Sequence, residues 1–512
     1  MNRQIIKNLI SNYMLTGIGM ILGFFLLPFL IRKLGHEGFG VTVVAEALIA
    51  FFFVFVSAIR IAVSRYVTLS LSQEKTEDCL LYLSTGRRIL HILMVVSLLL
   101  GVILAILFPV FFKVPANLHH QSQVMFLLIV ISFVLSIPNV VYWAILYGYQ
   151  RFDLINISNA GGTILRAVAI FTLYSFLSGK WASLGAYGMV YFVMTMGQNY
   201  IVYRWAMSLM PSAARIGFQY DLPKAAEILL YTRYTVMATV SSTLYGSVVP
   251  VIINIFCGPM ANTIFAVASR IPGVLSSIFL QPAWSLVPTC THYVGRNERD
   301  KVERLFFMYS KGTLIVFCPL IFSVAVCSRM ILHWWVGDGF NSAIVVMMIL
   351  SAGTLLGSFG FLSSVVTSAY GEIKIPTIVG IVSAFLSIGL GVVFAFFFKM
   401  GLPGLAMGGL LITLGGAFCF SPIYACHILK ADVKKYYKES FFIPILLTVF
   451  SFGWEILFQS DIHFSLRFFC LAALGTIFYL WLVLRWAFNE SEKRDILSLF
   501  KGRLAEKIAQ GA

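Results

Sequence analysis

The sequence contains little charge. Only 11% of its 512 residues are Asp, Glu, Lys or Arg, whereas 59% are hydrophobic. Soluble domains have about 25% charged and about 45–50% apolar residues. An aqueous fold with this composition would leave far more apolar side chains than one core can bury. The composition therefore excludes an ordinary soluble domain and indicates a protein embedded in a membrane.

Motifs of common enzymatic and metal chemistry are also missing. There is no Gly-x-x-x-x-Gly-Lys-Ser/Thr string, so the chain does not bind ATP through a phosphate-binding loop, and there is no His-Glu-x-x-His string. The eight cysteines show no Cys-x-x-Cys spacing and fall mostly in apolar stretches, as small buried hydrophobic residues do. We therefore expect no metal and no cofactor.

Long apolar segments fill most of the chain. A membrane-spanning helix needs about 20 apolar residues, and fourteen segments approach or exceed that length. We therefore predict an all-α integral membrane protein with about 14 transmembrane helices. The predicted spans are 9–31, 41–59, 89–112, 123–147, 157–177, 183–203, 234–254, 262–288, 313–335, 342–368, 376–398, 403–427, 441–459 and 466–488.

Basic residues occur mainly in every second loop. With a cytoplasmic N-terminus, and with Arg329, Arg467 and Arg485 at span ends counted with the nearest loop, 28 of the 37 Lys and Arg residues lie on the cytoplasmic side. Seven lie outside and 2 lie deep within spans. Such a bias sets orientation, because cationic loops stay in the cytoplasm. We predict that both termini are cytoplasmic. The net charge of +16 is spread over short loops beside the spans, so we expect contact with anionic lipid and none with nucleic acid.

Similar strings recur in the two halves of the chain at an offset of 222–227 residues. The string at 64–67, Ser-Arg-Tyr-Val, corresponds to Thr-His-Tyr-Val at 291–294, and Gly35 corresponds to Gly258. Tyr-Gly pairs end the fourth and tenth spans in the same way. These matches indicate a duplicated unit, hence two homologous six-helix lobes of one orientation with the substrate site between them.

This repeat predicts a domain organisation of two lobes, a linker, two extra helices and a tail. The predicted ranges are 1–203 for the N-lobe, 204–233 for a basic cytoplasmic linker, 234–428 for the C-lobe, 429–488 for the last two spans and 489–512 for a cytoplasmic tail.

Polar residues at helical spacing mark the first two spans of each lobe. In lipid, a polar side chain is costly unless it faces protein or water, so these stripes indicate the walls of a central cavity. The alternative is that small polar residues only allow close helix packing. The predicted cavity-lining residues are Asn8, Asn12, Thr16, Ser57, Thr239, Ser242, Asn262, Ser277 and Gln281.

Four arginines are candidate ligands for an anionic substrate. Arg166 and Arg270 lie deep within spans, where an arginine costs about 2.5–3.5 kcal/mol and so is a functional candidate. Arg60 and Arg65 end the second span on the predicted cytoplasmic side. A guanidinium can hold a phosphate or diphosphate through two hydrogen bonds. The alternatives are buried ion pairs for the first two arginines and topology anchors for the second two.

Glu46 is the one carboxylate well inside the predicted lobes, at a depth similar to that of Arg270. We predict that the two form part of an outer gate that breaks when the lobes separate. In the alternative, Glu46 is a protonatable coupling site, because burial raises the pKa of a carboxyl group. The predicted outer loops have at most about a dozen residues, which disfavours an enzyme with a large external catalytic loop and favours transport.

Several strings resemble one family. They are Pro28-Phe29-Leu30-x-x-x-Leu34-Gly35-x-Glu37-Gly38-Phe39-Gly40, then Arg65-Tyr66, then Gly148-x-x-Arg151-Phe152-x-x-x-Asn156, and finally Pro282-x-x-x-x-x-Pro288 leading to Gly295-Arg296-Asn297. Over essentially its whole length the chain resembles the polysaccharide-transporter branch of the multidrug/oligosaccharidyl-lipid/polysaccharide (MOP) exporter superfamily. Members often carry an acidic residue near the end of the seventh span, where this chain has Asn254.

The resemblance implies a V-shaped pair of lobes with a cationic cavity. It implies a flippase that moves undecaprenyl-diphosphate-linked oligosaccharides from the cytoplasmic to the periplasmic leaflet of a bacterial inner membrane by alternating access, for O-antigen, capsule or exopolysaccharide assembly. The polysaccharide polymerase and chain-length machinery are then expected partners. The alternatives are a multidrug or cation antiporter of the same fold, a flippase for the peptidoglycan precursor lipid II, and a membrane polysaccharide polymerase.

Overall fold

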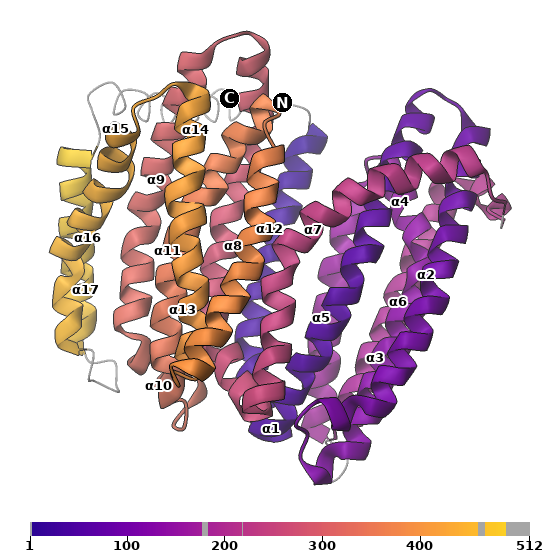
Figure 1. Ribbon diagram of the computed structural model, residues 1–512, viewed down its shortest axis with the longest axis horizontal. Coiled ribbons are helices and arrows are strands. Elements are labelled where there is room, and N and C mark those ends of the chain that lie inside the picture. Colours follow the sequence, from indigo (N-terminus) through magenta and orange to yellow (C-terminus); the bar gives the residue numbers. More distant parts are fainter. Residues whose placement is uncertain (1–2, 177–182, 218, 459–465, 488–512) are drawn as a thin grey trace, which may run out of the picture. The chain divides into compact units, whose positions relative to one another are not determined.

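The computed structural model describes residues 3–176, 183–217, 219–458 and 466–487, without the side chains of 3–16, 234, 237–238, 241–245, 279–285, 288–289, 458, 466, 469 and 487. Every regular element in this described part is a helix (Figure 1). Each of the fourteen predicted spans falls on one helix or on two or three consecutive helical segments. The predicted all-α membrane fold is confirmed.

The chain divides into two compact units, of which the first comprises Met1–Arg270 and Gly380–Leu405 and the second comprises Ile271–Val379 and Ala406–Ala512. In the first unit α3 packs against α2 and α6, and α5 packs against α1 and α6 (Figure 1). The helices that begin in this unit are α1 (Arg3–Ser72), α2 (Thr76–Phe111), α3 (His119–Ser136), α4 (Val140–Gly148), α5 (Phe152–Phe176), α6 (Leu184–Leu209), α7 (Leu222–Cys257), α8 (Pro259–Gly295) and α13 (Leu402–Thr413), with short helical turns at Ala116–Leu118, Ile137–Asn139, Pro211–Arg215 and Val393–Phe397.

The second unit is built around an aromatic cluster. The rings of Phe306 and Tyr436 stack with centroids 4.7 Å apart, and Phe359 packs edge-on to Tyr436. The helices that begin in this unit are α9 (Arg299–Val326), α10 (Ser328–Val336), α11 (Asn341–Tyr370), α12 (Lys374–Val392), α14 (Ser421–Leu429), α15 (Val433–Tyr437), α16 (Ile443–Phe452) and α17 (Leu466–Leu482), with turns at Leu414–Phe420, Lys438–Phe442 (η7), Gly453–Phe458 and Val483–Ala487 (η9).

The described part contains nine helices that are long and apolar enough to cross a membrane, and two shorter apolar helices at Gly246–Cys257 and Cys470–Trp486. The first of the nine, Gly17–Ser72, contains the first predicted span from residue 17 onward and the whole of the second. The two are joined at Gly35, whose φ of 74° and ψ of 168° break α1 at one residue. The predicted spans left residues 32–40 between them, whereas in the structure these residues are helical on both sides of Gly35. Glycine alone adopts a positive φ without strain, so one glycine is enough to reverse the chain.

Local geometry repeats at an interval of 223 residues. Gly35 and Gly258 both have positive φ, 74° and 90°, and Glu74 and Asn297 both have a φ of 58°. The helix before Glu74 and the helix before Asn297 end with the same pattern of two backbone hydrogen bonds. In each pattern one bond spans five residues, from Lys75 N to Ser70 O and from Glu298 N to Tyr293 O, each 3.0 Å long. Matched left-handed caps of this kind support the internal repeat. The exact lobe boundaries stay a prediction.

Candidate functional site

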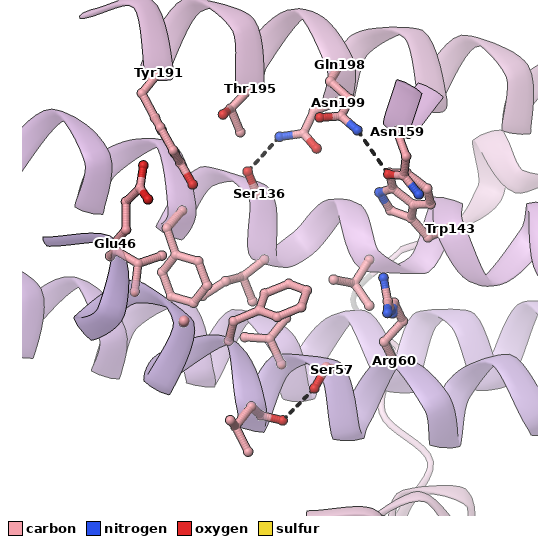
Figure 2. A pocket seen from close by; sticks show the side chains of 18 of the residues that line it. Glu46, Ser57, Arg60, Ser136, Trp143, Asn159, Tyr191, Thr195, Gln198 and Asn199 are labelled. Atoms are coloured by element: carbon pink, nitrogen blue, oxygen red, sulfur yellow. Dashed lines mark hydrogen bonds between the residues drawn. The ribbon is translucent and has the colours of Figure 1, made fainter. Parts of the chain in front are cut away.

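A cavity of about 520 Å³ lies inside the first unit. Its walls come from α1, the α3–α4 connection, α5, α6 and α7, so residues far apart in sequence meet there (Figure 2). The lining combines two arginines, Arg60 and Arg166, with one carboxylate, Glu46, several amides and hydroxyls, and aromatic rings. The cavity therefore has a largely apolar lining with a few polar groups and an excess of positive charge, within a membrane-spanning bundle.

Glu46 and Tyr191 lie near each other in the cavity wall (Figure 2). The Glu46 carboxylate accepts a 2.5 Å hydrogen bond from the Tyr187 hydroxyl. The Arg166 guanidinium lies over the Tyr191 ring at 4.3 Å from its centroid, which stabilises a desolvated cation. Among the described residues, the buried Nε of Arg166 has no hydrogen-bond partner. Arg166 thus lines the cavity with a buried donor that the described residues leave without a partner.

Arg60, Trp143 and Asn159 lie together elsewhere in the cavity (Figure 2). The Gln198 amide donates hydrogen bonds of 3.3 Å to Ser158 O and to Asn159 Oδ1. The Arg60 guanidinium lies 5.7 Å from the Phe53 ring centroid. Amides that both donate and accept hydrogen bonds suit a ligand with many hydroxyl groups.

A second cavity, of about 700 Å³, adjoins the first. The two share Arg60, Trp143 and Asn159 as lining residues. The second cavity continues along α1 to Arg65, whose guanidinium lies 4.5 Å from the ring centroid of Tyr231 on α7. It therefore extends the first cavity, with Arg60 and Arg65, toward the end of the bundle that is predicted to be cytoplasmic.

The structure brings several predicted site residues together. Glu46, Ser57, Arg60, Arg166 and Thr239 all line the first cavity, and Arg65 lines the second. That these residues bind substrate stays a prediction.

Arg270 does not join this group, because it is not among the lining residues of either cavity. Its guanidinium instead lies against α1 at Gly23, where a Cβ would come within 1.3 Å of Nη2. The Glu46 carboxylate accepts its hydrogen bond from Tyr187, and its charge also acts on the Arg270 guanidinium. The sequence showed that Glu46 and Arg270 lie at similar depth, but it could not show that Tyr187 from α6 reaches the Glu46 carboxylate. The gate role stays a prediction.

Asn262 and Ser277 are not among the lining residues of either cavity. Asn262 is 1% exposed, and within the described residues its side-chain amide has no hydrogen-bond partner. Ser277 belongs to the second unit and donates to Gly273 O at 2.9 Å. The side chains of Asn8, Asn12, Thr16, Ser242 and Gln281 lie outside the described residues.

Four residues on one face of α6 were missed by sequence reasoning. Tyr187, Tyr191, Thr195 and Gln198 are spaced four, four and three positions apart, which places them along one side of the helix. Three of them line the first cavity, and Tyr187 holds Glu46. This polar and aromatic stripe was a readable signal in the sixth span. The described residues contain no cluster of His, Cys, Asp and Glu that could hold a metal ion.

No family model matches the chain. It is 20% identical over 451 residues to an uncharacterized membrane protein, EpsK, from Bacillus subtilis (strain 168), covering 86% of each chain. It is 29% identical over 178 residues to a putative O-antigen transporter from Shigella flexneri, covering 34% of this chain and 41% of the relative.

Solved structures show the same fold. One is an inward-facing multidrug resistance MATE family transporter of the MOP superfamily, with a TM-score of 0.69 at 14% identity over 80% of this chain and 95% of that one. Another is the lipid II flippase MurJ in an inward closed conformation, with a TM-score of 0.67 at 17% identity over 92% of this chain and 96% of that one. These solved structures show that the chain has the fold of MOP-superfamily transporters, and the relatives agree with its resemblance to the polysaccharide-transporter family.

Proposed function

We propose that the protein is a flippase for undecaprenyl-diphosphate-linked oligosaccharides. It would carry them from the cytoplasmic to the periplasmic leaflet of a bacterial inner membrane, with both of its termini in the cytoplasm, and supply a polysaccharide polymerase on the far side. The proposed process breaks no covalent bond, so the protein would not be an enzyme. The similarity to a putative O-antigen transporter and to a lipid II flippase supports a substrate of this kind.

The observation that carries this proposal is the chemistry of the first cavity. A sugar diphosphate has charges and hydroxyls whose transfer through hydrocarbon is prohibitive, whereas its prenyl tail meets no such barrier. Arg166 has a donor without a partner and Arg60 shares the cavity with it, which suits a diphosphate. The amides of Asn159 and Gln198 suit sugar hydroxyls, and Trp143 offers an apolar face.

The sizes of the cavities fit a path for a large headgroup. Volumes of about 520 Å³ and about 700 Å³ each lie within the range of about 300–1,000 Å³ that is common for ligand sites. Because the two cavities share lining residues, a headgroup would meet Arg65 first, then Arg60, and Arg166 last.

The test is to deplete the protein in its native cell and to measure in which leaflet the polyprenyl-diphosphate-linked oligosaccharide lies, together with the amount of surface polysaccharide. We expect accumulation in the cytoplasmic leaflet and loss of surface polymer. Complementation with Arg166→Ala should lower transport about 10- to 100-fold at normal abundance, since a hydrogen bond to a charged group is worth about 1.5–3 kcal/mol. Arg166→Lys should retain part of the activity, because it keeps the charge but not the fork of donors.

Arg215→Ala is the matched control, because Arg215 is exposed and lies outside both cavities. Full activity of Arg166→Ala would contradict the proposed anion site. Accumulation of single repeat units in the periplasmic leaflet would indicate a polymerase, and accumulation of lipid II would indicate the peptidoglycan flippase.

One observation favours a second candidate, a cation or multidrug antiporter. Glu46 lies in the cavity beside the Tyr191 ring, and a carboxylate next to an aromatic ring can attract a cation. In that case depletion would leave lipid-linked oligosaccharides unchanged and raise cellular accumulation of cationic drugs, and Glu46→Gln would abolish export. The two arginines in the same cavity weigh against this function.

A further inference from the structure

A separate basic cavity lies in the second unit. Its volume is about 450 Å³, and four lysines line it, Lys311 from α9 and Lys434, Lys435 and Lys438 from α15 and η7. Only two acidic residues, Asp432 and Glu439, share the lining. The cavity therefore carries an excess of positive charge, and none of its lining residues belongs to the proposed transport cavities.

Both carboxylates already have structural roles. The Asp432 side chain accepts a 2.8 Å hydrogen bond from Lys434 N and caps α15. Glu439 lies 3.8 Å from the ammonium group of Lys311, whose residue is only 2% exposed. Burying a charged lysine is costly unless anionic groups lie nearby. The four lysines therefore outnumber the two carboxylates, and the lining keeps a net positive charge.

The lysines of α15 are held on a rigid support. Tyr436, between Lys435 and Lys438 in the sequence, is fully buried, stacks on Phe306 and donates a 3.1 Å hydrogen bond to Ser310 Oγ. Exposed lysines on such an anchored turn present a fixed group of ammonium ions, which lowers the entropic cost of binding an anion.

An apolar surface borders the cavity. On η7 and α16, Phe442, Leu446 and Phe450 are 61%, 66% and 71% exposed, and on η9 Trp486, which lines the cavity, is 66% exposed. Helices α16 and α17 lie side by side (Figure 1). In a membrane protein such a surface faces lipid tails, and tryptophan favours the level of the headgroups. The cavity thus lies where a lipid headgroup meets its acyl chains.

We propose that this cavity binds the phosphate headgroup of an anionic membrane phospholipid, with the acyl chains along α16 and α17. The loop that carries these lysines is predicted to be cytoplasmic, so the lipid would come from the cytoplasmic leaflet. A basic pocket between spans beside an apolar helix surface has the chemistry for such a ligand. The inference does not depend on the transported substrate.

The test uses the full-length protein in a neutral detergent and native mass spectrometry to count bound lipids. The probes are phosphatidylglycerol, phosphatidylcholine and inorganic phosphate. For the wild-type protein we expect one phosphatidylglycerol site clearly tighter than any phosphatidylcholine site and weakened by added salt. Changing Lys434, Lys435 and Lys438 together to Gln should weaken that site at least about tenfold. Single substitutions of each lysine, expected to weaken it about two- to fivefold, replace the triple variant if it does not fold.

The matched control changes Arg296, Lys301 and Lys374 to Gln, which removes the same charge from the second unit outside the cavity. This control should keep the tight site. If the control lost as much affinity for phosphatidylglycerol, the proposal would be overturned. The lipid would then be attracted by the overall positive charge rather than bound in the cavity. Displacement of the lipid by millimolar inorganic phosphate would also overturn the proposal, since the site would then hold a free anion.

Discussion

A close backbone approach between α1 and α8 gives a test of the fold at Gly40. A Cβ at this position would lie 1.8 Å from the backbone oxygen of Pro259. Ordinary contact begins at about 3.4 Å, so Gly40→Ala must push the two backbones about 1.6 Å apart. The same movement strains the 2.5 Å hydrogen bond from the Thr263 hydroxyl to His36 O.

The expected cost follows from these two effects. Overpacking typically costs about 1–3 kcal/mol, and the weakened hydrogen bond adds about 0.5–1.5 kcal/mol. Gly40→Ala should therefore lower stability by about 2–4 kcal/mol. We expect thermal unfolding of the purified protein in detergent to begin several degrees lower than for the wild type.

Gly19→Ala in the same helix is the control. No atom lies within 4 Å of a Cβ at Gly19, and alanine favours a helix over glycine by up to about 1 kcal/mol. This variant should unfold at or above the wild-type temperature. If Gly40→Ala unfolded no earlier than Gly19→Ala, the close contact between α1 and Pro259 would be refuted.

Two further predictions concern the repeated turns and the cavity wall. Gly35→Ala and Gly258→Ala each force a positive φ on alanine, so each should cost about 1–3 kcal/mol in thermal unfolding; a neutral effect at either site would show that its φ is not required. Tyr187→Phe removes the donor to Glu46 and should cost about 1–3 kcal/mol, because a buried carboxylate loses its partner. Adding Glu46→Gln should recover part of that loss, and additive effects in this double-mutant cycle would disprove the contact.

Much of the fold was readable in the sequence because a bilayer imposes simple rules. Apolar stretches of sufficient length must be helices, since lipid offers no partner for backbone polar groups. The match between Gly35 and Gly258 was a sign of the internal repeat, and both glycines have the positive φ that glycine adopts without strain. Arg60 and Arg166, selected as charges in apolar surroundings, share one cavity.

The partners of these residues could be decided only by tertiary structure. Helical spacing shows which residues share one face, but not which neighbouring helix that face meets. The sequence matched Glu46 with Arg270 by depth, whereas packing of α6 against the bundle brings Tyr187 to Glu46. In the same way, α9 and α15 bring Lys311 to the loop lysines more than a hundred residues later. Periodicity therefore determined the helices and their polar faces, and packing of side chains from distant helices decided the sites.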